Sequence, residues 1–149
     1  MSIFFSANFK YSEIMCPCGC EKTSPIDAHL IYLLQSLREK LGEPIYISKG
    51  GGIRCKKYNK WIGGYIDSPH LHGKAVDISV VGMDIIDLAK KAKDVGFTRI
   101  GLYPFDNFIH VDTVGPYPSA SWVRTGGKPK DYKYKYFKSL EEAILSIEG

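Results

Sequence analysis

The chain lacks any apolar run close to the roughly 18 residues that a membrane span needs, so no membrane-spanning helix is expected. Its first residues, MSIFFSANFKYSEIM, lack both a basic stretch before the short apolar run and a small-residue cleavage site. We therefore expect no secretory signal. Internal repeats and low-complexity linkers are also lacking, and 149 residues suit one domain, so we expect a single domain over residues 1–149.

A strong charge of either sign is lacking as well. The 20 lysines and arginines against 16 acidic residues give a formal net charge of +4, which fits an anionic partner surface but does not require nucleic acid. Basic and aromatic residues interleave in KPKDYKYKYF near the end of the chain. We interpret this segment as an edge strand protected by lysines rather than as a nucleic-acid interface.

Cysteine is scarce, but three of the four cysteines lie together. Cys16, Cys18 and Cys20 fall within MCPCGC, and the fourth is Cys55. Without an export signal the expected compartment is reducing, so structural disulfides are not the first expectation. A C-x-C-x-C cluster can hold a soft metal, but closed zinc sites usually space their ligands as C-x(2–4)-C. Free thiols, pairing with Cys55 and a second metal site all stay open at this point.

Apolar periodicity and capping residues predict three helices. The first begins with Ser24 as its N-cap and Pro25 at the first helical position, and continues to about residue 41. The second covers roughly residues 84–95. The third begins at Ser139, where Glu142 completes a capping box.

The strand signals predict a mixed fold. A short strand lies in PIYIS, a longer one covers residues 74–81, and the segments 98–103 and 108–113 form an antiparallel hairpin. Because helices and strands mix without repeated βαβ units, we expect an α+β fold with a small antiparallel sheet and flanking helices. The remaining segments are expected to be an extended N-terminal segment (1–24), a long glycine-containing loop (49–69) and a C-terminal extension (114–149) that carries the last helix.

Histidine and aspartate cluster in two short segments, SPHLHGKAVD and FIHVD. His70 lies in the glycine-bounded loop, Asp77 in the strand that follows, and His110 in the hairpin. A catalytic zinc ion takes three protein ligands and keeps a fourth position for water, so two imidazoles and a carboxylate suffice. A single polar residue is more often a satisfied polar group than a ligand, and we expect His29, in the first helix, to be a helix-surface or satisfied core residue. Three such residues bordered by glycines favour a metal site.

These segments resemble a known family. SPHLHGKAVDI and FIHVDT are similar to the signature S-x-H-x-x-G-x-A-x-D … H-x-D of the zinc D-alanyl-D-alanine carboxypeptidases and their L-alanyl-D-glutamate endopeptidase relatives. NFKYSEIMCPCGC, GGIRCKKYNKWIGG and IGLYP resemble further family segments, so the resemblance covers about residues 8–113. It implies the hedgehog/DD-peptidase fold and a zinc metallopeptidase that cuts peptidoglycan stem peptides.

The resemblance also implies roles for particular residues. His70, Asp77 and His110 become the zinc ligands, and Arg54 becomes a substrate-anchoring or oxyanion-stabilising residue. Many relatives place an acidic general base three residues before the last histidine, where this chain has Asn107.

The general base therefore stays open. Asp106 and Asp112 are both candidates, and Asp112 could instead orient a ligand as a hydrogen-bond acceptor. Ser68 and His72 are candidate substrate contacts, although a plain turn role suits Ser68 equally well.

We expect a monomeric zinc hydrolase acting on cell-wall peptides, with no nucleic acid and no membrane span. The bond cut is either that of a D-Ala-D-Ala carboxypeptidase or that of an L-Ala-D-Glu endopeptidase. A phage lysin (endolysin), made in the cytoplasm and acting on the wall after release, suits the lack of a signal. The alternative is a catalytically inactive wall-binding or phage structural module of the same fold.

Overall fold

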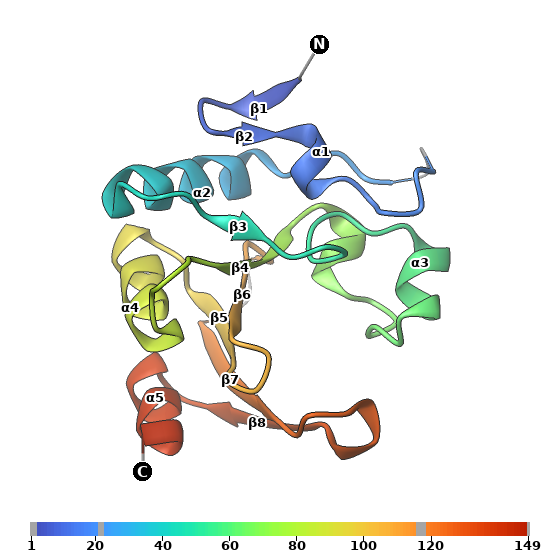
Figure 1. Ribbon diagram of the computed structural model, residues 1–149. Coiled ribbons are helices and arrows are strands. Elements are labelled where there is room, and N and C mark those ends of the chain that lie inside the picture. Colours follow the sequence, from blue (N-terminus) through green and yellow to red (C-terminus); the bar gives the residue numbers. More distant parts are fainter. Residues whose placement is uncertain (1–2, 21–22, 116–118, 149) are drawn as a thin grey trace.

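A computed structural model describes residues 3–20, 23–115 and 119–148 (Figure 1). Its centre is a six-stranded sheet with the strand order β3-β4-β6-β5-β7-β8. These strands are β3 (Tyr46–Ile47), β4 (Ala75–Ser79), β5 (Arg99–Tyr103), β6 (Phe108–Asp112), β7 (Ala120–Thr125) and β8 (Lys133–Phe137). A separate pair, β1 (Phe4–Ser6) and β2 (Phe9–Lys10), lies near the N-terminus. The α+β class is confirmed, and so is the antiparallel hairpin of β5 and β6.

The sheet differs from the predicted one in size and in direction. It has six strands, and β5 pairs with β7 in parallel, whereas the other neighbours are antiparallel. The difference arises in residues 114–149, where the sequence predicted an edge strand and a terminal helix but no strand at the position of β7. A parallel neighbour is joined by a crossover connection and not by a tight turn, so the sequence has no hairpin turn from which β7 could be predicted.

Five α-helices and two short 3-10 helices complete the described chain. They are α1 (Tyr11–Ile14), α2 (Ala28–Leu41), α3 (Lys56–Trp61), η1 (Pro69–His72), α4 (Ile85–Val95), η2 (Pro129–Asp131) and α5 (Leu140–Glu148). The N-terminal segment is thus not merely extended, because it folds into β1, β2 and α1. The loop 49–69 likewise contains α3, where no helix was predicted.

The helix caps follow the predictions in part. The carboxylate of Asp27, and not Ser24, caps α2 by accepting a hydrogen bond from the Leu30 amide at 3.2 Å. The prediction failed because the Asp27 carboxylate is also held by the Thr113 hydroxyl at 2.8 Å, a contact between distant parts of the chain. At α5 the Ser139 hydroxyl accepts from the Glu142 amide at 3.1 Å, as predicted.

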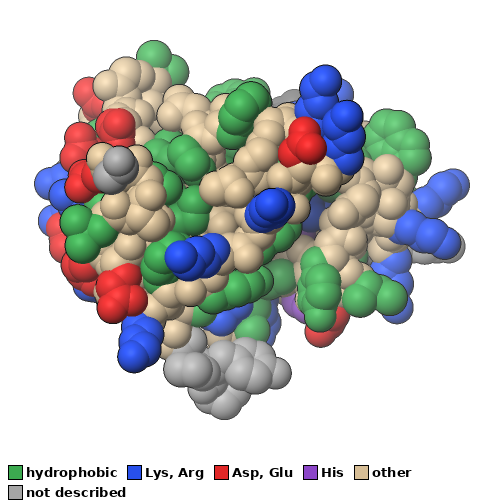
Figure 2. Space-filling model, turned by 90° about the horizontal axis from the view of Figure 1, so that it is seen from below, with side chains coloured by type: hydrophobic (Ala, Val, Ile, Leu, Met, Phe, Trp, Pro, Cys, Tyr) green, Lys and Arg blue, Asp and Glu red, His purple; other side chains and the backbone are tan. Residues whose placement is uncertain are grey.

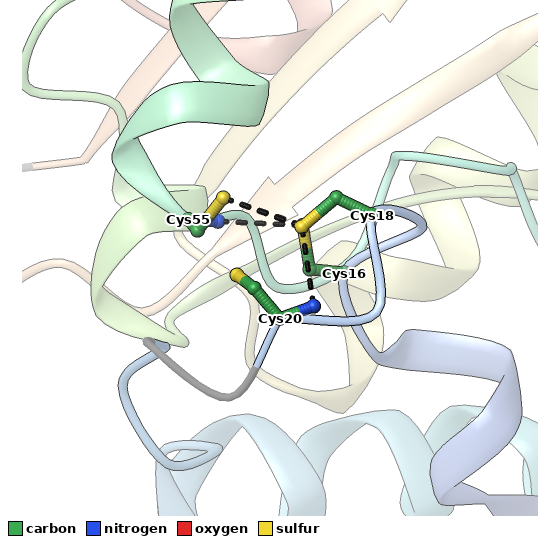
Figure 3. Close-up of side chains that lie close together, drawn as sticks. All are labelled: Cys16, Cys18, Cys20 and Cys55. Atoms are coloured by element: carbon green, nitrogen blue, oxygen red, sulfur yellow. Dashed lines mark hydrogen bonds between the residues drawn. The ribbon is translucent and has the colours of Figure 1, made fainter.

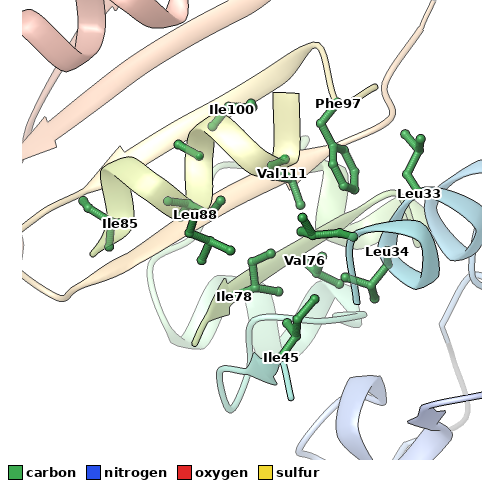
Figure 4. Packing of buried hydrophobic residues seen from close by; sticks show 14 of the residues in the cluster. Leu33, Leu34, Ile45, Val76, Ile78, Ile85, Leu88, Phe97, Ile100 and Val111 are labelled. Carbon is green, nitrogen blue, oxygen red and sulfur yellow. The ribbon is translucent and has the colours of Figure 1, made fainter. Parts of the chain in front are cut away.

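The hydrophobic core lies between one face of the sheet and the helices α2 and α4 (Figure 4). Val76 and Ile78 of β4, Ile100 of β5 and Val111 of β6 are fully or almost fully buried there. They pack with residues of the helices and connecting segments, among them Leu33, Leu34, Ile45, Ile85, Leu88 and Phe97. Because side chains alternate along a strand, the residues between them point to the opposite face of the sheet. That opposite face carries the polar groups described below.

Strand β8 forms one edge of the sheet, as predicted for the lysine-rich segment. Its Lys133 and Lys135 are exposed, which discourages pairing with another chain. On the face seen in Figure 2, most acidic side chains gather on the left, whereas basic ones are spread over the whole face. Within residues 3–20, 23–115 and 119–148, no helix has the length and apolar character that a bilayer crossing requires.

Candidate metal centre and active site

Asp77 and His110 lie side by side on neighbouring strands. The register between β4 and β6 pairs Asp77 with His110, and the same row continues through Gly101 of β5 to Trp122 of β7. A Cβ atom at Gly101 would lie 2.4 Å from the Trp122 indole ring. Glycine there leaves room for the indole, whose ring centroid lies 5.2 Å from that of His110. The sheet register therefore builds one wall of the site.

His70 comes from η1, which precedes β4. The Ser68 hydroxyl caps this short helix by accepting a hydrogen bond from the His70 amide at 3.2 Å. Gly73 ends the helix with a φ of 67°, a left-handed conformation that glycine adopts without strain. The chain then enters β4, so His70 and Asp77 point to one place although they belong to different elements. The structure thus brings together His70, Asp77 and His110, all buried.

The hydrogen bonds of the two imidazoles direct one nitrogen of each ring toward Asp77. Nδ1 of His70 lies 2.8 Å from the Gly52 carbonyl oxygen, which only accepts, so Nδ1 carries the proton. The lone pair of His70 Nε2 then faces Asp77 Oδ1 at 3.3 Å. Nε2 of His110 lies 2.8 Å from Asp112 Oδ2, and its Nδ1 lies 3.0 Å from Asp77 Oδ1.

This geometry suits a divalent metal ion. Ligand atoms about 2.1 Å from a tetrahedral zinc ion are about 3.4 Å apart, close to the two distances to Asp77 Oδ1. A lone pair facing a carboxylate oxygen without a proton between them is repulsive, and a cation between them reverses the sign of the interaction. Two imidazoles and one carboxylate are a set that zinc accepts, as the sequence predicted.

Asp112 contacts the side of His110 that faces away from Asp77. Its side chain is fully buried, and its Oδ1 accepts hydrogen bonds from Arg99 Nε at 2.7 Å and from the Val114 amide at 3.1 Å. With the bond to His110, three donors hold this carboxylate. A carboxylate behind an imidazole fixes the ring orientation and raises the basicity of its other nitrogen.

The charges of the group favour a cation beside Asp77. Burial alone would raise the pKa of Asp77, but the adjacent His70 and His110 hold it well below its usual range. Burial lowers the pKa of His70, which therefore stays neutral. Burial acts in the same direction on His110, but the hydrogen bonds to Asp112 and Asp77 outweigh it and raise the pKa of His110 to about 9. Asp77 thus stays ionised beside the two imidazoles, and a metal ion held by the three residues would take the place of the proton between His110 Nδ1 and Asp77.

Arg54 lies at the rim of the same group. Its Nη2 is 3.6 Å from Asp77 Oδ2, while its Nε donates to the Gly50 carbonyl at 2.7 Å and its Nη1 to Asn59 Oδ1 at 3.1 Å. Because these contacts fix the guanidinium, its charge is preorganised beside the site. Arg54 also lines a cleft of about 1290 Å³, together with His72 and with residues of α3.

Other residues predicted for the site lie outside the group of His70, Asp77 and His110. Asp106 forms an ion pair with Arg124 and is not in the group of three, as far as the described residues go. Asn107, next to it, has a φ of 57° in the turn between β5 and β6. The His72 ring is exposed, and its Nε2 lies 2.9 Å from Asp67 Oδ1. The structure thus does not bring Asp106 and Asp112 to the same part of the site.

Several residues that support the site without binding a metal were not predicted from the sequence. They are Gly52, whose carbonyl holds His70; Asn59 and Gly50, which hold Arg54; and Arg99 and Trp122, which flank Asp112 and His110. The position of Arg99 could have been predicted from the sequence, since side chains alternate along a strand and Arg99 therefore lies on the same face as Gly101. The roles of the backbone carbonyls could not have been predicted, because every residue has a carbonyl group.

The fold and the site define the class as an α+β domain with a candidate metal-binding group on its mixed sheet. The family model described as Peptidase M15 matches residues 7–112. The chain therefore belongs to the peptidase M15 family, and the resemblance seen in the sequence is confirmed. The hedgehog-like fold that this resemblance implied fits the observed α+β architecture.

Two curated relatives share shorter stretches with the chain. A probable peptidoglycan L,D-endopeptidase MepK from Haemophilus influenzae is 42% identical over 50 residues, which are 34% of this chain and 26% of the relative. A zinc D-Ala-D-Ala carboxypeptidase from Streptomyces albus G is 34% identical over 71 residues, which are 47% of this chain and 27% of the relative. The chain thus spans about a quarter of the length of each of these relatives.

Proposed function

We propose that the protein is a zinc-dependent peptidase that hydrolyses the stem peptides of peptidoglycan. The observation that carries this proposal is the convergence of His70, Asp77 and His110, with the far nitrogen of each imidazole already engaged by Gly52 or Asp112. Membership of the peptidase M15 family supports the peptidase activity. The names of both relatives support peptidoglycan as the substrate.

In this proposal His70, Asp77 and His110 hold the ion. When bound, zinc supplies Lewis acidity and an activated water at neutral pH. Asp112 accepts a hydrogen bond from His110 Nε2 and so holds the ring with Nδ1 toward the ion, which makes Asp112 a positioning residue. Arg54 presents a fixed positive charge at the rim, where it can bind a substrate carboxylate or stabilise negative charge developing on the scissile carbonyl.

The two candidate bonds are the D-Ala-D-Ala bond and the L-Ala-D-Glu bond. The relatives' names include a D-Ala-D-Ala carboxypeptidase and an L,D-endopeptidase, so they support neither bond over the other. Stem peptides offer a carboxylate near either bond, which Arg54 can recognise. A lysin-type role stays a prediction.

Digestion of purified peptidoglycan by the zinc-loaded protein, followed by mass analysis of the products, tests the activity and the bond together. Release of free D-alanine identifies the carboxypeptidase reaction, and release of peptides that begin with D-glutamate identifies the endopeptidase reaction. The His70→Ala variant serves as the control and should release neither. Zinc-loaded protein that leaves peptidoglycan and soluble stem peptides intact would contradict the proposal.

The position of Asp106 favours an inactive wall-binding module as the second candidate. Asn107 stands where many relatives have the acidic base, and the neighbouring Asp106 is paired with Arg124. Such a module would bind zinc and sediment with peptidoglycan but release no fragments. The same digestion therefore separates the two candidates.

Isosteric variants of the two acids test the role given to Asp112. Asp112→Asn should lower the zinc affinity of this site about 10- to 100-fold, because the amide no longer holds the His110 ring as a carboxylate does. Asp106→Asn should leave the affinity unchanged. Zinc affinity is measured by competition with a chromophoric chelator. The part of the titration that is lost in an Asp77→Asn variant belongs to the His70–Asp77–His110 site. Equal affinities for the Asp112 and Asp106 variants would contradict the role.

A further inference from the structure

The four cysteines gather where the N-terminal segment meets the loop before α3 (Figure 3). Cys16, Cys18 and Cys20 follow α1, and Cys55 immediately precedes α3, more than 30 residues farther along the chain. All four sulfur atoms lie within 4.8 Å of one another. Cys16 and Cys55 are buried, whereas Cys18 is exposed and Cys20 half-buried. Neither the proposed activity nor its metal centre uses this cluster.

The sulfur spacing matches a metal tetrahedron. The Sγ–Sγ distances are 3.3 Å between Cys16 and Cys18, 3.5 Å between Cys18 and Cys55, and 3.8 Å between Cys16 and Cys55. A disulfide bond is about 2.05 Å long, so these three sulfurs are not bonded to one another. Zinc binds thiolates at about 2.3 Å, which makes each edge of a regular ZnS4 tetrahedron about 3.8 Å.

Backbone amides point at the sulfur atoms. The Cys55 amide donates to Cys16 Sγ at 3.5 Å, the Cys20 amide to Cys18 Sγ at 3.4 Å, and the Tyr58 amide to Cys55 Sγ at 3.3 Å. Three sulfurs thus each accept an N–H group, which stabilises the negative charge of a thiolate. Hydrogen bonds of this kind to ligand atoms are the support that metal sites require.

The local backbone explains how an unusual spacing can close a site. Gly19, between Cys18 and Cys20, has a φ of 73°, and its amide donates to the Cys16 carbonyl at 3.1 Å. This tight turn reverses the chain within MCPCGC, so cysteines two residues apart face the same point instead of opposite sides. Cys55 completes the group from the other segment.

We propose that Cys16, Cys18, Cys20 and Cys55 bind a second zinc ion in a closed tetrathiolate site. Such a site carries a net charge of −2, and the cleft that Cys18, Cys20 and Cys55 line also contains Lys49, Lys56 and Lys57. These lysines offset the negative charge. No open ligand position remains, so the ion has a structural role.

The site fastens the N-terminal segment to the loop that supports the active site. Between them the Ile53 amide donates to the Ile14 carbonyl at 2.7 Å, and a Cβ atom at Gly52 would lie only 2.3 Å from that same oxygen. Gly52 and Arg54 of this loop contact the catalytic group, and Cys55 follows Arg54 directly. The second zinc ion thus stabilises the loop that orients His70 and Arg54.

Metal counting on protein purified with zinc and a phosphine reductant tests the inference without any activity assay. The wild-type chain should carry two zinc ions. Cys18→Ser and Cys20→Ser should each carry one, and so should Asp77→Asn. Ser24→Ala, which changes another residue lining the same cleft, should carry two. Cobalt substitution should give an intense sulfur-to-metal charge-transfer band in wild type and Asp77→Asn, and this band should be lost in the cysteine variants.

Thiol alkylation of the wild-type chain keeps the inference testable if the cysteine variants do not fold. Zinc should protect all four thiols from alkylation, and a chelator should expose them. Wild-type protein with one zinc ion that Asp77→Asn removes, and without the thiolate band, would overturn the inference. So would disulfides among these cysteines, found by mass analysis of zinc-loaded protein. Because the readout is metal and thiol content, its failure is distinguishable from a lack of hydrolysis.

Discussion

Asp77→Asn is expected to remove the metal ion from the His70–Asp77–His110 site and to abolish peptidoglycan hydrolysis with it. The carboxylate supplies the only negative charge among the three ligands, and its Oδ1 lies between the two imidazole nitrogens. An amide of the same shape keeps the packing but is a poor ligand and cannot balance the charge of the ion. The loss should exceed the roughly 10- to 100-fold effect of removing an outer partner.

Zinc content, measured by mass spectrometry, and fragment release from peptidoglycan are followed together for this variant. Ser79→Ala is the matched control, because Ser79 lies on the same strand and, two residues along, on the same face. It should keep both zinc and activity. Full hydrolysis by metal-free Asp77→Asn protein would refute the metal-centre assignment.

Gly73→Ala is expected to destabilise the protein strongly. Gly73 has a φ of 67°, and a Cβ atom there would lie 2.0 Å from the Pro25 carbonyl oxygen, which belongs to the backbone. The left-handed conformation costs a non-glycine residue about 1–2 kcal/mol. Displacing the packed backbone adds about 1–3 kcal/mol. We expect the free energy of unfolding to fall by about 2–5 kcal/mol, with weaker zinc binding at His70.

Gly82→Ala separates the two causes. Gly82 has a φ of 78°, close to that of Gly73, but no atom lies within 4 Å of its added Cβ. It should lose only the conformational part, about 1–2 kcal/mol. Urea unfolding of the two variants at the same zinc concentration measures the difference. Equal losses would show that the contact with Pro25 does not matter.

Several parts of the fold could be predicted because their signals are local. The helix α4 begins after its cap Asp84, and the hairpin β5–β6 has a short connection between two alternating segments. The lysine-rich edge strand β8 also follows from its own composition. Features without a clear local sequence pattern are harder to predict. The Asp27 cap, the helix α3 and the parallel strand β7 were therefore not predicted.

The candidate site divides in the same way. The residue types and their order in SPHLHGKAVD and FIHVD pointed to His70, Asp77 and His110 as a possible ligand set. The roles of Asp106 and Asp112 could not be separated, because both acids lie near His110 in the sequence and the sequence does not show which carboxylate contacts its ring. Only the sheet geometry places Asp112 against His110 and Arg99, and Asp106 against Arg124.

By itself the sequence determined the class of the protein: an α+β domain with a metal-binding pattern and the segments of the peptidase M15 family. Short-range periodicity, caps and motif order are properties of neighbouring residues, so they can be found without a structure. The tertiary structure alone decided which groups meet, including the Gly52 carbonyl at His70 and the four sulfur atoms beside Arg54. Those contacts depend on strand register and on turns at particular glycines, which bring together residues far apart in the chain.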